Sequence, residues 1–144
     1  MAIKIVLPIS DVSAGWDTST GGNHYGEIDE DISDSYSDAD YVETSTIDSA
    51  DEFGLTDMEA NCNEVTNIEV HIRGSITDSS GNAYIRAELF HTAGTPLTDN
   101  PQDCTQAQFG GDGVIGTVTK TWSSDTLTKA QADSLQLKLT FKTT

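Results

Sequence analysis

The stretch LQLKLTFK, residues 135–142, alternates apolar and polar residues with a period of two. Because successive side chains of a β-strand point to opposite faces, the alternation predicts a strand that buries its leucines and Phe141. Residues 68–73 and 83–90 alternate in the same way, and residues 3–7 open the chain with the same pattern. The dominant local signal in this chain is therefore the half-buried strand.

Residues 68–73 and 83–90 are separated by the polar, glycine-containing segment TDSSGN, residues 77–82. Two alternating runs joined by such a segment predict a long β-hairpin. The Val- and Thr-rich residues 114–122 predict a further strand, and shorter strand candidates lie at 41–47 and 52–55.

Helix signals are nearly absent. The segment TKAQ, residues 128–131, fits a capping box in which Thr128 caps the helix and Gln131 reaches back to it, and the helix would end near Asp133. About 7 to 8 strands with one short helical turn predict an all-β fold, an antiparallel, jelly-roll-like β-sandwich. The strands of the C-terminal half, together with the N-terminal one, would supply the core.

The length of 144 residues suits a single domain, residues 1–144. Within it we expect an acidic, loop-rich segment at 10–64 and regular strands at 65–144. Two long connections, 10–40 and 92–113, are expected to carry binding or packing functions, since long ordered loops on small sandwiches often do.

Charge is distributed very unevenly. The net charge is -17, and residues 1–72 contain 17 acidic residues against Lys4 alone, whereas residues 73–144 contain 7 acidic and 6 basic residues. Such a surface repels phosphates, so nucleic acid and anionic membranes are not expected as direct partners. No apolar run approaches the roughly 20 residues that span a bilayer, and Met1–Ile9 is shorter than a signal peptide. The acidic half is interpreted either as solvated loops or as a patch for cations or a basic partner.

Four aspartates in this half could bind calcium, because Asp29 with Asp31 and Asp38 with Asp40 place carboxylates at short spacings. The EF-hand pattern is not matched, since Asp34 stands where the sharp-turn glycine belongs. No metal or other cofactor is therefore expected, with calcium at these residues as the alternative.

Cys62 and Cys104 allow one disulfide, which would tie two loops together, or two free thiols, the default in a reducing cytoplasm. Trp16 and Trp122 are interpreted either as packing residues or as sugar-stacking platforms.

The three histidines, His24, His71 and His91, are scattered, and we expect structural or surface roles for them. His71 and His91 would be cross-strand neighbours if the predicted hairpin forms. No Ser/His/Asp order, phosphate-binding glycine loop or metalloprotease motif is present, so enzymatic activity is not expected.

Several short motifs together resemble small structural proteins of tailed bacteriophages. They are PISD (residues 8–11), SAGW (13–16), HYGEIDE (24–30), DSYSDADYV (34–42) and TW (121–122), with a short helical turn before the last strand. The resemblance spans nearly the whole chain. It implies a β-sandwich virion component, namely a capsid decoration (cement) protein or a head or tail fibre module, and it implies no catalytic residues.

From the resemblance and the patterning we expect a non-enzymatic virion structural protein, made in the host cytoplasm and located on the virion surface. Its partners would be the major capsid protein or another virion protein, and further copies of itself, with a trimer favoured. Ile3, Ile5 and Leu7 would form an arm that adds to a neighbouring sheet, or else an ordinary strand of the same sandwich. The alternative function is a carbohydrate-binding module that uses Trp16 or Trp122 beside a calcium-supported loop; a hydrolase with two carboxylates near a cleft is a third.

Overall fold

The computed structural model describes residues 7–28, 39–92 and 94–144. It confirms the expected fold class: the protein is mostly β, with 46% strand and 10% helix, and its sheets are antiparallel and arranged as a sandwich.

The larger layer is a sheet with the strand order β1-β4-β12-β7-β8. These strands are β1 (Pro8–Ser13), β4 (Ala50–Leu55), β12 (Gln136–Thr143), β7 (Ala83–His91) and β8 (Thr95–Pro96), and β9 (Gln102–Thr105) also pairs with β7. The centre of this layer is β12, which pairs with β7 along its whole length and with β4 on its other side.

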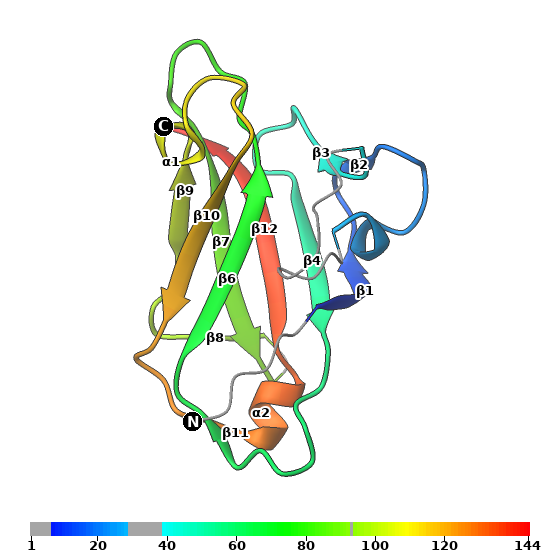
Figure 1. The fold of residues 1–144 in the computed structure, drawn as a ribbon, viewed down its shortest axis with the longest axis vertical. Helices are drawn as coiled ribbons and strands as arrows, with labels where there is room; N and C mark the ends of the chain where they lie inside the picture. Colours follow the sequence, from blue (N-terminus) through cyan, green and yellow to red (C-terminus); the bar gives the residue numbers. More distant parts are fainter. Residues whose placement is uncertain (1–6, 29–38, 93) are drawn as a thin grey trace.

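The second layer is the pair β6 (Ile68–Gly74) and β10 (Gly116–Trp122), which crosses in front of the larger sheet in Figure 1. Two short pairs complete the strands: β2 (Asp17–Thr18) with β3 (Val42–Glu43), and β5 (Glu64–Val65) with β11 (Leu127–Thr128).

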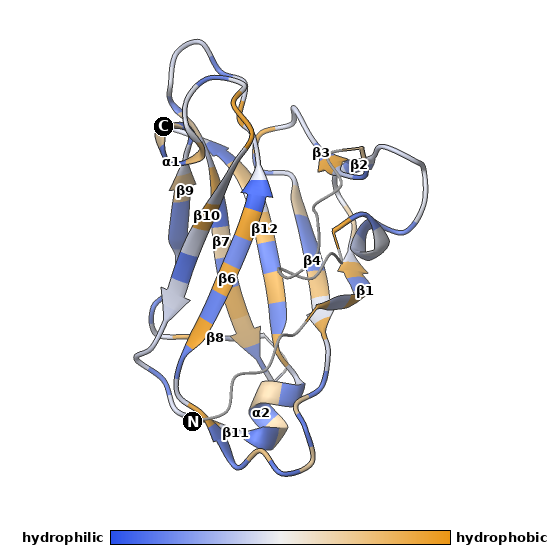
Figure 2. Cartoon of the chain, in the orientation of Figure 1, coloured by the Kyte–Doolittle hydropathy of each residue, from blue (hydrophilic) through white to orange (hydrophobic). Residues whose placement is uncertain are grey.

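The core lies between the two layers. Figure 2 shows the apolar residues alternating with polar ones along β6, β7 and β12. The fully buried side chains include Phe53 of β4, Leu89 of β7, Cys104 of β9 and Trp122 of β10. In the last strand region Leu135, Leu137 and Leu139 are buried as the alternation predicts, and Phe141 packs against the core while partly exposed.

The helix at residues 128–133 is confirmed as α2 (Lys129–Asp133), with both hydrogen bonds of the Thr128–Gln131 capping box present. The prediction of a single helical turn is wrong, because α1 (Gln106–Phe109) and the 3₁₀ helix η1 (His24–Glu27) also form. Each is only 4 residues long, too short for the helical period to be visible in the sequence.

The predicted hairpin of residues 68–73 and 83–90 is wrong. β6 pairs with β10 and β7 pairs with β12, so the chain passes from one layer to the other between them. Asp78 organises this connection by accepting hydrogen bonds from the backbone of Ser80, Asn82 and Ala83. The alternation could not reveal this, because strands of opposite layers bury the same period-two pattern in one core. His71 accordingly lies opposite Thr119 rather than beside His91.

Other strand bounds also differ from the expectation. The strand predicted at 114–122 begins at Gly116, leaving Val114 and Ile115 exposed, and the one predicted at 41–47 contains only Val42–Glu43 as strand. Most of the strand predicted at residues 3–7 lies outside the described residues, and the first described strand is β1 (Pro8–Ser13).

Candidate functional site

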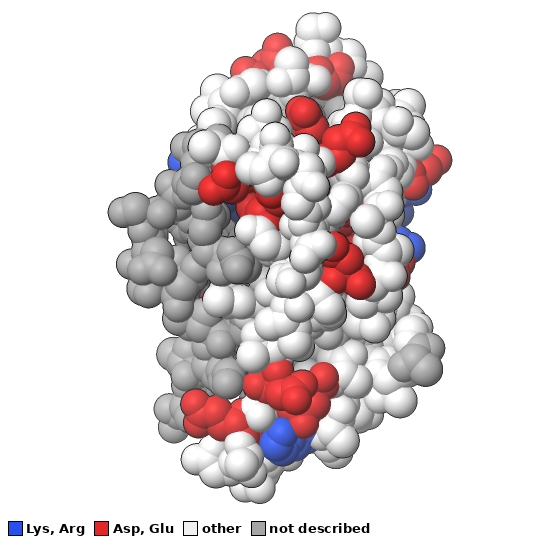
Figure 3. Space-filling model, turned by 90° about the vertical axis from the view of Figure 1, so that its right-hand side faces the viewer, with Lys and Arg blue, Asp and Glu red and all other residues white. Residues whose placement is uncertain are grey.

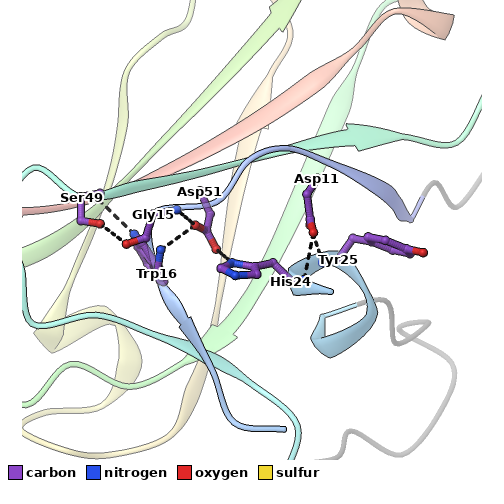
Figure 4. Close-up of polar contacts among 7 residues, drawn as sticks. All are labelled: Asp11, Gly15, Trp16, His24, Tyr25, Ser49 and Asp51. Atoms are coloured by element: carbon purple, nitrogen blue, oxygen red, sulfur yellow. Dashed lines mark hydrogen bonds and ion pairs between the residues drawn. The ribbon is translucent and has the colours of Figure 1, made fainter. Parts of the chain in front are cut away.

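Carboxylates fasten the segment after β1, which contains β2 and η1, to the larger sheet. Asp51, on β4, is 0% exposed and accepts hydrogen bonds from the backbone N–H groups of Gly15 (2.6 Å) and Trp16 (2.9 Å). Its other oxygen lies 2.6 Å from Nδ1 of His24, as Figure 4 shows. One carboxylate therefore joins β4 to two separate parts of the N-terminal segment.

Gly15 allows this close approach. A Cβ atom at this position would lie 2.6 Å from the carbonyl oxygen of Ala50, closer than any real contact. Ser49 strengthens the same junction, since its hydroxyl donates to the Gly15 carbonyl (2.6 Å) and its own carbonyl accepts from the indole N–H of Trp16 (3.0 Å).

Two further carboxylates hold η1. Asp11, on β1, accepts from the backbone N–H groups of His24 (3.1 Å) and Tyr25 (2.8 Å). Glu27 is 5% exposed and accepts from the hydroxyls of Ser19 (2.7 Å) and Thr20. These hydroxyl hydrogen bonds hold the pKa of Glu27 below its ordinary value.

The Asp51–His24 pair has the form of an aspartate that orients a histidine for acid/base chemistry. A nucleophile would have to lie within hydrogen-bond reach of the imidazole. Within the described residues, however, the one side chain bonded to the His24 ring is Asp51. The hydrogen bonds of Asp51 to Gly15, Trp16 and His24 make this arrangement a structural junction. Sequence reasoning missed it, although an aspartate at an inward position of the alternating strand ADEFGL, residues 50–55, was a usable signal.

A second feature is an apolar groove of about 1680 Å³ that runs between β6 and the β4–β12 side of the larger sheet. Ile68, Val70 and Ile72 line it from β6, and Leu55, Leu137 and Leu139 line it from the other layer. Its lining also contains acidic residues, namely Glu27, Asp40, Glu43, Glu59, Glu64, Glu69 and Asp78.

The cations of the second half of the chain are largely engaged in ion pairs. Arg86 pairs with Asp103 at 2.8 Å, Lys138 with Glu52 at 3.1 Å and Lys142 with Asp48 at 2.6 Å. Figure 3 accordingly shows several separate groups of Asp and Glu and few basic residues on the side of the molecule that it presents. The described surface near the groove therefore carries excess negative charge.

Of the predicted calcium ligands, Asp29, Asp31 and Asp38 lie outside the described residues, and Asp40 is exposed. In the described part of the chain, no group of three or more His, Cys, Asp or Glu residues is placed to hold a metal ion.

The two tryptophans differ in environment. Trp122 is 2% exposed and donates its indole N–H to Asn100 at 2.7 Å, so its interpretation as a sugar-stacking platform is wrong. Trp16 is half-buried, packs against the core and uses its N–H at Ser49. Both rings are therefore engaged in packing.

Cys62 and Cys104 are both free thiols, so the alternative of a disulfide is wrong. Cys104 is 0% exposed on β9, and burial raises the pKa of its thiol to about 11. Cys62 is partly exposed in its loop.

Ile3 and Ile5 of the expected arm lie outside the described residues, whereas Leu7 is described. The backbone N–H of Leu7 donates to the Thr56 hydroxyl (3.2 Å), and its carbonyl accepts from the Thr56 backbone (3.0 Å). Leu7 thus continues the β1–β4 pairing within its own molecule, so for this residue the ordinary-strand alternative is the one observed.

Among the described residues there is no helix with the length and apolarity needed to cross a membrane. Comparisons of the chain with family models, with curated proteins and with solved structures find no match.

Proposed function

We propose that this chain is a non-enzymatic structural protein of a bacteriophage virion, a capsid decoration protein that binds the major capsid protein and further copies of itself. The observation that carries the proposal is the groove beside β6, because an apolar groove between the layers of a sandwich is a surface that can bind an apolar segment of another protein.

The resemblance of the sequence to phage structural proteins supports the same reading. The internal junctions support it as well, since Asp11, Glu27 and Asp51 use their carboxylates to fasten loops. A coat component needs such tightly fastened loops, because loosely held ones are the preferred sites of proteolysis.

The first test is the composition of purified particles of a phage that encodes this sequence. Mass spectrometry should find the chain at a copy number in a simple ratio to the major capsid protein, and cryo-electron microscopy should place it on the outer face. Particles that lack the chain would overturn the proposal.

A sharper test adds purified protein to particles prepared without it. Wild-type chain should bind until the capsid sites are saturated, and Val70→Glu, which places a charge in the groove, should reduce bound copies by at least about tenfold. Thr119→Glu, on the exposed face of the neighbouring strand β10, is the matched control and should bind like wild type. Equal binding by both variants would show that the groove is not the capsid contact.

A further inference from the structure

The strand β10 forms one edge of the second layer. It is paired with β6 over 7 consecutive residues without a register shift, and within the described residues it pairs with no other strand. In Figure 1 it lies on the side of β6 that faces away from β4. Thr117, Thr119 and Thr121 are all exposed on it. Near its ends, the Gln102 side chain donates to the Thr121 carbonyl (3.2 Å) and α1 lies against Gly116, so the open part of this edge is centred on Thr119.

The edges of the larger sheet are less suited to pairing with another strand. β1 has register shifts after Pro8 and after Asp11. On the other side of this sheet, β8 has only 2 residues, one of them Pro96, and β9 carries Asp103. Irregular register, proline and charge each protect an edge against an added strand. The regular edge of β10 has the first two of these protections nowhere along its length.

The one charged residue of β10 is held away from the edge. A lysine on an edge strand ordinarily discourages pairing. Lys120, however, alternates with the buried Val118 and Trp122, and its ammonium donates to the side-chain oxygen of Gln108 on α1 at 3.2 Å. The charge is thereby directed toward α1, and the backbone of β10 stays accessible to a partner strand.

Charge indicates which partner fits. Two copies of a chain with a net charge of -17 repel one another, so they can associate only through a surface that is poor in carboxylates. Residues 113–124, GVIGTVTKTWSS, contain no acidic residue. The edge of β10 is therefore a place where a second copy can approach, and such a contact should strengthen when salt screens the remaining repulsion.

The order of residues 117–121, TVTKT, suits pairing with a copy of itself. Because threonine occupies every second position, a two-fold axis at Thr119 places threonine opposite threonine on the exposed face, and such cross-strand pairs are favourable. Val114 and Ile115, 46% and 48% exposed just before β10, would then lie beside the end of the partner's strand and lose exposure. The edge is thus complementary to the same edge of a second molecule.

We infer that β10 pairs in antiparallel orientation with β10 of a second copy of this chain, around a two-fold axis at Thr119. The two second layers would then form one continuous sheet of four strands, in the order β6-β10-β10-β6. The inference rests on the proposed function, in which the chain associates with itself, and it identifies the surface that does so.

The test measures the molar mass of purified chain by size-exclusion chromatography with light scattering. Wild type should have twice the mass of one chain. Thr119→Asp and Thr119→Lys should each weaken the dimer at least about tenfold, because like charges would face each other across the axis. Both should keep the circular dichroism spectrum of wild type, since Thr119 is exposed. A monomeric wild type, or a dimer that persists in both variants, would overturn the inference.

A mixture of the two variants provides the sharper result. Equimolar Thr119→Asp and Thr119→Lys should form a heterodimer, detected by native mass spectrometry, because opposite charges then face each other. Ser13→Asp and Ser13→Lys make the same charge changes at an exposed position of β1 and should each remain dimeric. A mixture of the Thr119 variants that stays monomeric would contradict the pairing at this residue.

Hydrogen exchange locates the contact without any substitution. The backbone amides of residues 117–121 should exchange more slowly in concentrated, dimeric protein than in dilute, monomeric protein, whereas residues 8–13 of β1 should exchange at the same rate in both. A dimer that shows no such protection in β10 would be joined at another surface, and the inference would be wrong.

These outcomes separate the inference from the proposed function. A monomeric wild type that still decorates particles would remove the dimer and leave the decoration role standing. A dimer joined through β10 but absent from virions would do the reverse. A monomeric wild type whose decoration is lost in Thr119→Asp would assign the edge of β10 to the capsid protein and overturn the inference.

Discussion

The contact between the two layers of the sandwich is stabilised differently from the attachment of the N-terminal region, residues 8–28, which includes β1 at the edge of the larger layer. Between the layers, Leu89, Phe53 and Trp122 are buried by apolar contact. Residues 8–28 contribute no fully buried apolar side chain to the core, and their buried charged residue is Glu27. In residues 8–28, carboxylates that accept backbone and hydroxyl hydrogen bonds hold the chain in place. Between the layers, apolar packing does so.

This difference explains how a chain with a charge of -17 can fold. A carboxylate that accepts several N–H groups is stabilised in its ionised form, so it needs no basic partner. The described parts of the acidic half, residues 7–28 and 39–72, can therefore be ordered although they contain no Lys or Arg.

The largest expected effect is in the apolar core. Leu89→Ala should lower the free energy of unfolding by about 4 kcal/mol, because it leaves a cavity at a fully buried site on β7. Ile115→Ala, at a residue 48% exposed, should change it by less than about 0.5 kcal/mol. Urea denaturation measures both, and similar losses for the two variants would contradict the placement of the core.

The next effect is at the junction on β4. Asp51→Asn should cost about 2 kcal/mol, because the neutral amide replaces a carboxylate that binds Gly15, Trp16 and His24. The fluorescence of Trp16 should change with it, since its ring lies at the same junction. Asp17→Asn, at an exposed residue, is the control. A junction that contributes little would leave both stability and emission at wild-type values.

A smaller effect is expected from pH at Glu27. Its hydrogen bonds lower its pKa in the folded protein, so its contribution to stability is complete above the pKa of a free glutamate, about 4.3, and is lost as the pH falls through the lower folded value. Glu27→Gln should have a lower Tm than wild type at neutral pH, and the two curves should converge in acid. For Glu59→Gln, at an exposed position, the curve of Tm against pH should run parallel to that of wild type. Parallel curves for Glu27→Gln would contradict the role assigned to this carboxylate.

The last prediction changes reactivity rather than stability. At pH 8 one thiol per native chain should react rapidly with Ellman's reagent, because Cys62 is partly exposed whereas Cys104 is buried and its pKa is raised to about 11. Unfolding should release the second thiol, and Cys62→Ser should remove the fast one. Rapid reaction of both thiols in the native chain would show that β9 opens readily.

Much of the secondary structure could be predicted from local pattern. The alternation in residues 135–142 predicted the burial of Leu137 and Leu139, and the capping box at Thr128 predicted where α2 begins. These features depend on neighbours along the chain, which the sequence contains. The short helices α1 and η1 were missed because 4 residues are too few to display a helical period.

The candidate sites were mostly beyond prediction, because their parts are distant along the chain. Asp51 contacts Gly15, 36 residues away, and the groove joins β6 to residues of β4 and β12. The position of Trp122 in the sequence likewise could not show that its indole would be buried and would donate a hydrogen bond to Asn100.

Alternation along the chain determines which face of a strand is apolar, and so the amino-acid order alone was enough for the all-β class and for most of the core. The alternation does not determine which strands pair, since residues 68–73 could in principle pair with any strand of matching pattern. Pairing β6 with β10 instead of β7 separates the two layers and leaves the groove between them. Long-range packing determines this pairing, because the free energy of burying the two layers against each other depends on all of the strands together.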